Sequence, residues 1–365
     1  MGFPPDLGGV QTYAYEIAQA YKRRGLRCCV VTSRTGPRGL AWEDGVCVIN
    51  VGVGSQTLVA VRMLRVLRRL RRSPYLRKST VHVTTWRVGA AVATAGWRYF
   101  LTVHGREVVA TRQPVFKWLM YRVLDRAELI LSVSRFSMTE CVPPRYAYKA
   151  LYRWNGVSAW ALQLGNKRLS ANREASKTLT ILFAARLIRG KNPQAAIKAF
   201  AKFLEKGGRG RLIIAGEGSE RKPCERHALD LDVATNVEFV GHVRGESLVT
   251  LYQNADIFIH PHSALETFCI SIADAMASGL AVISGLDGAP PEYLSQRLGF
   301  VVDGDDPGHA ADALLRLYED ASLRREIGRH AALFAAEHFS WDRHVAPILD
   351  ASDRPKFLTD GIVED

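Results

Sequence analysis

The sequence contains no long hydrophobic run. Among its 365 residues there is no stretch of about 18 uncharged apolar residues, which excludes a membrane-spanning helix. Residues 1–6 offer neither a basic segment nor an apolar core, so we expect no signal peptide, and Asp6 stands where a myristoylation signal needs Ser or Thr. With 47% hydrophobic and 23% charged residues, the composition indicates a globular protein and excludes disordered, collagen-like and coiled-coil chains.

Paired cysteines and metal-binding clusters are also missing. The six cysteines are scattered without a C-x-x-C spacing, so we interpret them as reduced thiols and not as a disulfide framework. His260 and His262 flank Pro261, but no third ligand is close in the sequence. We therefore expect neither a metal nor another cofactor.

Acidic residues are scarce in the first half of the chain. Residues 1–160 contain 25 Lys and Arg against 8 Asp and Glu, a net charge of +17, whereas the remaining residues carry a net charge of −4. This change of sign indicates two domains with different partners, and the basic one should attract an anion. We expect no nucleic acid there, because the basic half has no recognisable reading motif and its aromatic residues are not interleaved with its arginines.

Short apolar runs alternate with amphipathic segments along most of the chain. Such alternation is typical of parallel sheets with helices on both faces. We predict an α/β protein with two doubly wound, Rossmann-like domains at 1–160 and 179–340, a linker at 161–178, and a helix and tail at 341–365 that packs back on the first domain. The runs expected to be strands are 28–32, 81–84, 100–103, 129–133, 180–184, 211–215, 237–240, 257–259 and 281–283.

The segment 58–72 predicts a helix with one apolar side and one side that carries only arginine. Such a helix is typical of contact with an anionic lipid surface, and the alternative is a surface helix with a solvated basic face. We favour membrane contact because six arginines occur without one acidic residue. The arginines assigned to this contact are Arg62, Arg65, Arg68, Arg69 and Arg72.

Two loops that follow predicted strands carry groups suited to a phosphorylated sugar, since ligands of doubly wound sheets bind at the carboxyl ends of the strands. Arg186 and Lys191 lie in a turn before a helix, where cations and free amides together suit a diphosphate. Glu266 is expected at the start of a later helix, with Asp274 eight residues on and roughly on the same face. Their carboxylates could accept hydrogen bonds from sugar hydroxyls.

The first domain offers two further candidates. Gly8 and Gly9 directly precede a predicted helix, and glycine lets the backbone approach a ligand closely. His104 ends a predicted strand and is followed by Gly105. A histidine in that place could bind an acceptor hydroxyl or a developing charge, although a lone histidine is more often structural.

Taken in order, these segments resemble the retaining GT-B glycosyltransferases of the large family 4 type, over nearly the whole chain. No single motif is specific, but the combination is. The matching segments are GGVQTY at 8–13, HG at 104–105, DRAELILSVS at 125–134, NGV at 155–157, Arg186 with Lys191, GEG at 216–218, VEFVG at 237–241, and the E-x7-E position from Glu266 to Asp274.

The resemblance implies that the second domain binds a nucleotide sugar. Arg186 and Lys191 would stabilise the diphosphate leaving group, and Asp274 would bind the ribose. His104 would lie near the transferred sugar and the first domain would hold the acceptor. The resemblance also implies that no metal is needed, because cations and helix amides replace it. The donor contacts are assigned to Glu266, to the backbone at Thr267, Phe268, Cys269 and Ile270, and to Gly8, Gly9, Gly216 and Gly241.

The sequence departs from the family pattern in several places. Asp274 replaces a Glu, Cys269 stands where Gly is usual, and Trp154 and Ser158 replace the usual residues around the NGV segment. A hydrophobic strand of the family that precedes the glycine loop is also missing, and its place is in the middle of the first sheet. We hypothesise that the true start lies upstream of Met1; a truncated, poorly active product is the alternative.

From these observations we predict a cytoplasmic glycosyltransferase, peripheral on the inner face of the membrane. It would move a hexose, with retention, from a nucleotide-diphosphate sugar to a cell-envelope polysaccharide or lipid-linked acceptor. The basic first half favours an anionic, membrane-bound acceptor. Two alternatives remain: a GT-B nucleotide-sugar hydrolase or epimerase, which would turn over without an acceptor, and a degenerate, non-catalytic GT-B scaffold.

Overall fold

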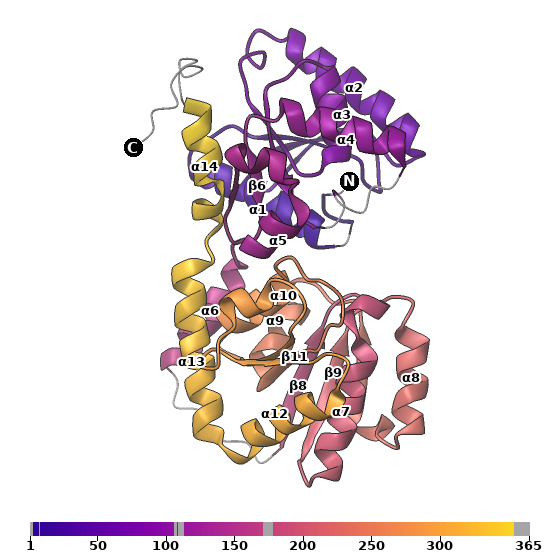
Figure 1. Ribbon diagram of the computed structural model, residues 1–365, viewed down its shortest axis with the longest axis vertical. Coiled ribbons are helices and arrows are strands. Elements are labelled where there is room, and N and C mark those ends of the chain that lie inside the picture. Colours follow the sequence, from indigo (N-terminus) through magenta and orange to yellow (C-terminus); the bar gives the residue numbers. More distant parts are fainter. Residues whose placement is uncertain (1–2, 7, 106–107, 109–112, 171–177, 354–365) are drawn as a thin grey trace. The chain divides into compact units, whose positions relative to one another are not determined.

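The computed structural model describes residues 3–6, 8–105, 108, 113–170 and 178–353 (Figure 1). The chain forms two compact units. The first contains Met1–Ser132, Met138–Arg153 and Trp341–Asp365, and the second contains Val133–Ser137 and Trp154–Ser340.

The first unit has two small sheets. In one, of order β1-β3-β2, β1 is parallel and β2 antiparallel to β3; the other is parallel throughout, with order β4-β5-β6-β7. Its strands are β1 (Cys29–Thr32), β2 (Gly39–Glu43), β3 (Val46–Asn50), β4 (Val81–Val83), β5 (Tyr99–Val103), β6 (Ile130–Ser132) and β7 (Ala150–Tyr152). Its helices are α1 (Gly9–Arg23), α2 (Gln56–Arg72), α3 (Trp86–Thr94), α4 (Pro114–Arg126) and α14 (Trp341–Asp353), and α5 (Arg135–Cys141) is shared with the second unit.

Within the described residues no strand joins β1 to β4, which are the edges of these two sheets. β5 and β6 are buried along their whole length, whereas Val30 and Val31 of β1 are only half-buried. Helix α1 contacts both sheets: Ala14 packs in a cluster with residues of β3, and Tyr13 hydrogen bonds with Thr102 of β5. The prediction that a strand is missing from this sheet stays a prediction.

The second unit is a single six-stranded parallel sheet with the order β10-β9-β8-β11-β12-β13. Numbered from its own first strand this order is 3-2-1-4-5-6, the doubly wound order, in which the strand order reverses between β8 and β11 while all strands stay parallel. The strands are β8 (Leu179–Ala184), β9 (Gly210–Ala215), β10 (Val237–Gly241), β11 (Ile257–His260), β12 (Ala281–Gly285) and β13 (Phe300–Val302). The helices are α6 (Ala159–Ser170), α7 (Pro193–Glu205), α8 (Arg221–Asp230), α9 (Gly245–Asn254), α10 (Ile270–Ala277), α11 (Pro290–Tyr293), α12 (Pro307–Glu319) and α13 (Ala321–His338).

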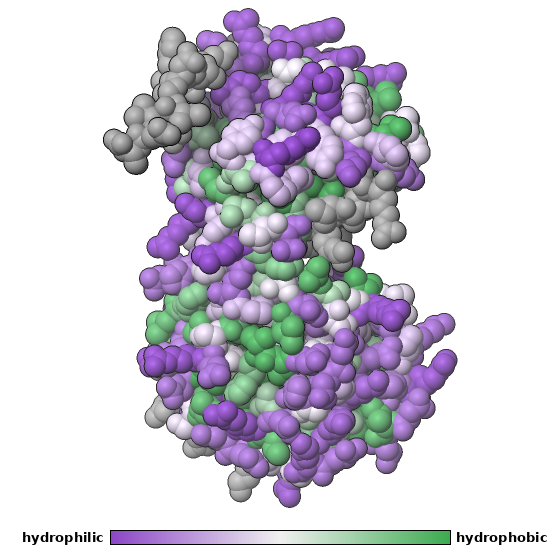
Figure 2. All heavy atoms as spheres, in the orientation of Figure 1, coloured by the Kyte–Doolittle hydropathy of each residue, from purple (hydrophilic) through white to green (hydrophobic). Residues whose placement is uncertain are grey.

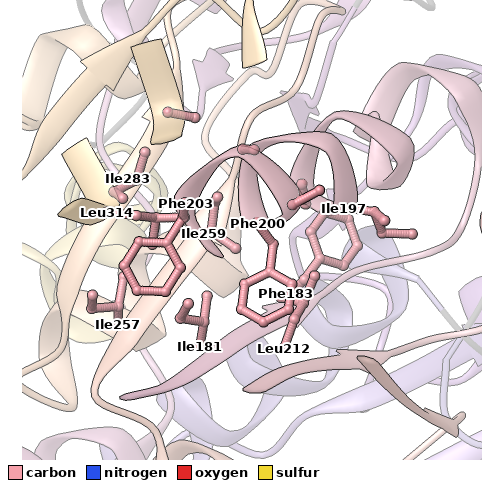
Figure 3. Packing of buried hydrophobic residues seen from close by; sticks show 14 of the residues in the cluster. Ile181, Phe183, Ile197, Phe200, Phe203, Leu212, Ile257, Ile259, Ile283 and Leu314 are labelled. Atoms are coloured by element: carbon pink, nitrogen blue, oxygen red, sulfur yellow. The ribbon is translucent and has the colours of Figure 1, made fainter. Parts of the chain in front are cut away.

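The core of the second unit explains why its central strands consist mostly of apolar residues. Figure 3 shows Phe200 and Phe203 of α7 packed over strand residues such as Ile181 and Ile257, all of them fully buried. The residues of β8, β11 and β12 are buried on both faces of the sheet. Parallel strands covered by helices on both sides have this pattern, which is why these runs show no polar alternation.

The structure confirms a strand within each of the nine predicted runs and a helix, α2, over 58–72. It adds four strands that the sequence analysis missed: β2 and β3, which pair through the Asp44–Gly45 turn, and the short β7 and β13. Part of the predicted linker, 161–170, belongs instead to α6 in the second unit, because Ala161 and Leu164 are buried there. Among the described helices none is long and apolar enough to cross a bilayer.

Candidate functional site

Lys191 and Glu266 lie at the point where the second sheet reverses its strand order. Lys191 follows β8 in a short 3-10 helix, Arg189–Lys191, and Glu266 follows the neighbouring strand β11. The Nζ atom of Lys191 lies 2.5 Å from Oε1 of Glu266, and the two side chains are 19% and 13% exposed. Ligands of open parallel sheets bind in the crevice at this point of reversal, so the pair occupies the expected place for a bound ligand.

Charge around this pair favours a protonated lysine. Burial acts to lower the pKa of Lys191, and so does Arg186, but the electrostatic influence of Cys269 and Glu266 and the hydrogen bond to Glu266 outweigh them, so the pKa is raised. Burial raises the pKa of the Cys269 thiol, with Lys191 acting in the opposite direction. The site therefore holds a fixed, largely buried cation, which is what a diphosphate needs.

Glu266 does not lie at a helix start, as the sequence analysis expected. Helix α10 begins at Ile270, after Cys269, which has φ 63° in the left-handed region that favours glycine. The main chain of Glu266 instead pairs with the loop after β12, where it accepts a hydrogen bond from the Ala289 amide and donates one to Asp287. Glu266 and Asp274 therefore do not share one helix face.

Glycines shape the loop that carries Arg186. A Cβ atom on Gly216 would lie 1.9 Å from the Ala185 carbonyl oxygen, and one on Gly218 would lie 2.2 Å from that of Leu187. The Gly216 amide also donates to the carbonyl of Gly241 at 2.7 Å. Any side chain at Gly216 or Gly218 would push the Arg186 loop away, so these glycines position that loop; a donor contact at Gly216 or Gly241 stays a prediction.

Asp274 is buried and already hydrogen bonded within the second unit. Its two carboxylate oxygens accept from the Ser158 amide at 2.8 Å and from the Ser158 hydroxyl at 3.0 Å, at the start of α6. Ser158 and Asp274 are two of the positions where the sequence departs from the family pattern, and the structure pairs them. Asp274 therefore has a structural role, the fixing of Ser158, that the sequence did not reveal. Its proposed contact with the ribose stays a prediction.

We expect Asp274→Ala to lower the stability of the second unit. The substitution leaves the Ser158 amide and hydroxyl buried without this acceptor, at a cost of about 2–4 kcal/mol. Chemical denaturation followed by circular dichroism would show an earlier transition, and Ser158→Ala, which removes only the hydroxyl, should shift it less. An unchanged transition together with a weakened affinity for the donor would show that Asp274 serves the ligand instead.

In the first unit His104 follows β5 and contacts α1. The rings of His104 and Tyr13 are 4.3 Å apart at nearly right angles. Burial first, and then the electrostatic influence of His344, lower the pKa of His104 to about 3, so its imidazole is neutral at physiological pH. Gly8 caps the N-terminus of α1 with φ 143°, and Gly9 and Tyr13 lie on that helix. Through Tyr13, the helix that follows the two glycines contacts His104.

The apolar side of α2 faces the protein core. Val59, Met63 and Leu67 recur every four residues and are buried with residues of α3 and α4. These side chains therefore belong to the core of the first unit, and the membrane contact assigned to the arginines stays a prediction. The arginines of the opposite side are the part of α2 that remains for contact with lipid.

Among the described residues no group of three or more His, Cys, Asp or Glu side chains could hold a metal ion. His262 hydrogen bonds with the carbonyls of His260 and Asp287, and thus has a loop-fixing role. The expectation that the protein works without a metal stays a prediction.

Comparison with known proteins matches both halves of the chain to family models. Residues 8–150 match the glycosyl transferase 4-like domain, and residues 167–334 match the glycosyl transferases group 1. An uncharacterized glycosyltransferase of Methanocaldococcus jannaschii is 31% identical over 207 residues, 54% of this chain and about half of that relative's length (52%). A D-inositol 3-phosphate glycosyltransferase of Pseudarthrobacter chlorophenolicus is 27% identical and aligns over 95% of this chain and 90% of its own.

Solved structures agree on the fold. Sucrose-phosphate synthase from Thermosynechococcus elongatus superposes with a TM-score of 0.78 at 18% identity, over 94% of this chain and 92% of that one. HepE of Anabaena, solved with UDP-glucose, has a TM-score of 0.74 at 18% identity, over 96% and 98% of the two chains. The chain thus belongs to the group 1, family 4-like glycosyltransferases and has the GT-B fold.

Proposed function

We propose that this glycosyltransferase moves a hexose from a nucleotide-diphosphate sugar to an anionic, lipid-linked or saccharide acceptor of the cell envelope, with retention of configuration and without a metal. The buried Lys191–Glu266 pair at the point of sheet reversal carries this proposal. HepE of Anabaena was solved with UDP-glucose, which supports a nucleotide sugar as the donor.

The residues present suit the loss of a nucleoside diphosphate. As the bond between the sugar and the diphosphate breaks, negative charge develops on the departing phosphate oxygen. Lys191 and Arg186 supply fixed positive charge for that oxygen, and such preorganised charge stabilises the transition state more than the ground state. Glu266 holds Lys191 in place and has a second carboxylate oxygen for a donor hydroxyl.

The acceptor is proposed from charge and from the relatives. The first half of the chain carries a net charge of +17, which favours an anionic acceptor. One relative is a D-inositol 3-phosphate glycosyltransferase, and another, from Mycobacterium tuberculosis, is a GDP-mannose-dependent alpha-(1-6)-phosphatidylinositol monomannoside mannosyltransferase, 23% identical over 95% of both chains. Both names contain a phosphorylated inositol, so inositol phosphates and phosphatidylinositol glycolipids are the first acceptors to test.

The test is release of nucleoside diphosphate from a panel of UDP- and GDP-sugars, with and without these acceptors and in the presence of EDTA. We expect release that depends on an acceptor, persists with EDTA and yields a product whose anomeric configuration, read by NMR, matches the donor. Equal release without any acceptor would support the hydrolase or epimerase instead. No binding of any donor would support the scaffold.

A further inference from the structure

A basic hollow lies at the end of α2 in the first unit, and none of its lining residues is assigned to the donor. It has a volume of about 680 Å³ and is formed by α2, the turn after it and the end of α3. We name it the cationic cup, because five of its seven lining residues are cations. The lining residues are Arg68, Arg71, Arg72, Arg77, Lys78, Thr94 and Ala95.

The charges of the cationic cup are not balanced by acids. No Asp or Glu occurs between Asp44 and Glu107. None of the ion pairs found among the described residues involves a cup cation. Arg71 donates a hydrogen bond to the carbonyl oxygen of Ala95, which caps the carboxyl end of α3, at 3.0 Å.

The partial negative charges of nearby helix ends balance only part of the positive charge in the cationic cup. The carboxyl ends of α2 and α3 both lie at the cup, and each contributes roughly half a negative charge. Five cations against about one negative charge leave an excess of about four positive charges. An ordinary solvated basic face would spread such charges apart, whereas here they line one hollow.

We propose that the cationic cup is an anion-binding site, formed by residues other than those of the donor site, that takes a phosphomonoester headgroup of an anionic membrane lipid. Guanidinium groups bind phosphate through two parallel hydrogen bonds, and a phosphomonoester carries more charge than the diester of an ordinary phospholipid. Tyr75 lies between Arg72 and Arg77 in the sequence and is 90% exposed. An exposed tyrosine in the turn that carries Arg77 and Lys78 suits the interface between headgroups and water, which favours a lipid over a free phosphate. In the view of Figure 2, hydrophilic residues dominate the top of the first unit.

This inference extends the proposed membrane contact from a diffuse attraction to a selective site. The test is co-sedimentation with vesicles of equal surface charge that contain either phosphatidic acid or phosphatidylserine in phosphatidylcholine. We expect at least about tenfold tighter binding to phosphatidic acid, from the additional charge-assisted hydrogen bonds. Equal binding to both vesicles would overturn the proposal.

Two double variants that each remove two positive charges make the test specific. Arg77→Ala with Lys78→Ala changes the cup, and Arg65→Ala with Arg69→Ala changes exposed arginines of α2 that do not line it. The control pair should weaken binding to both vesicles alike, by about thirtyfold. The cup pair should in addition abolish the preference for phosphatidic acid, and identical behaviour of the two pairs would contradict the proposal.

Glycerol 3-phosphate tests whether the cationic cup binds a soluble phosphomonoester and not a lipid headgroup. We expect it to compete with the vesicles only at millimolar concentration, whereas micromolar competition would assign the cup to a soluble phosphate and overturn the lipid. These readings do not require sugar transfer, so they separate failure of this inference from failure of the proposed function. Donor binding by the cup variant should equal that of the unmodified protein.

Discussion

Replacement of Lys191 by alanine is expected to reduce sugar transfer by about 10²–10³-fold while the protein stays folded. Its ammonium is the cation that the structure holds in place beside Glu266, and its pKa is raised, so it carries its charge throughout the physiological pH range. Loss of this charge affects the step in which the diphosphate departs. The decrease should therefore appear mainly in kcat and only secondarily in KM.

Arg186→Ala should act in the same direction, because Arg186 is the other cation of this site and lies in the loop fixed by Gly216. Lys198→Ala is the matched control: Lys198 lies on α7, close in sequence and exposed, and no role in the site is assigned to it. Circular dichroism of each variant separates lost activity from lost structure. Full turnover by folded Lys191→Ala protein would show that the diphosphate is not bound here.

Acidification is expected to destabilise the first unit well before general acid unfolding. A chain of hydrogen bonds connects its elements: Tyr21 to His82 at 2.9 Å, His82 to Thr102 at 2.7 Å, Thr102 to Tyr13 at 2.8 Å, and Tyr13 to His344 at 2.8 Å. In this chain each imidazole and hydroxyl can donate once and accept once. His82 and His344 take part as neutral rings, because a protonated ring would have no lone pair to accept from a tyrosine hydroxyl.

The sign of the pH effect follows from the lowered pKa values. Burial first, and then the electrostatic influence of neighbouring histidines, lower the pKa of His82 to about 3, as they do for His104. In the unfolded chain both pKa values return to about 6.5, so between about pH 6.5 and pH 3 the unfolded state binds more protons. Stability is therefore complete above about pH 6.5 and lost as the pH falls, on the order of 2 kcal/mol for each histidine at pH 5.

Hydrogen exchange of β5 and α1 between pH 7 and pH 5 would measure this loss. His82→Gln keeps one donor and one acceptor but cannot be protonated, so its stability should depend less on pH even if it is lower at pH 7. His309→Gln, on an exposed residue of the second unit, should leave the profile of the first unit unchanged. A wild-type profile that is flat down to pH 5 would show that these histidines do not become protonated on unfolding.

Prediction from the sequence was most successful where local pattern and burial coincide. Runs such as 181–184 and 257–259 are apolar at every position because both faces of a central parallel strand are covered, and that pattern can be read without a structure. The strands β2 and β3 were missed; β2 is an edge strand whose Leu40 and Trp42 are exposed, and β3 between β1 and β2 alternates between buried and half-buried residues. Their Asp44–Gly45 turn was the available signal.

The candidate site was predicted in part. The five-residue offset of Arg186 and Lys191 located the cations, but Glu266 was placed on a helix because the sequence does not show that Cys269 adopts a left-handed conformation. The pairing of Asp274 with Ser158 spans 116 positions and depends on how α6 packs beside α10. No local pattern contains such a contact, although both residues had been noted as departures from the family.

The sequence by itself determined the fold class, the succession of strands and helices in the second unit, the basic character of the first half and the residues that could hold a diphosphate. These properties depend on composition and on short-range periodicity, which act before any distant contact forms. Only the tertiary structure decided that Lys191 meets Glu266 where the sheet reverses, that the apolar side of α2 faces the core, and that five cations surround one hollow. Each of these depends on segments far apart in the chain being brought together, and their proximity is a consequence of packing, which local sequence does not specify.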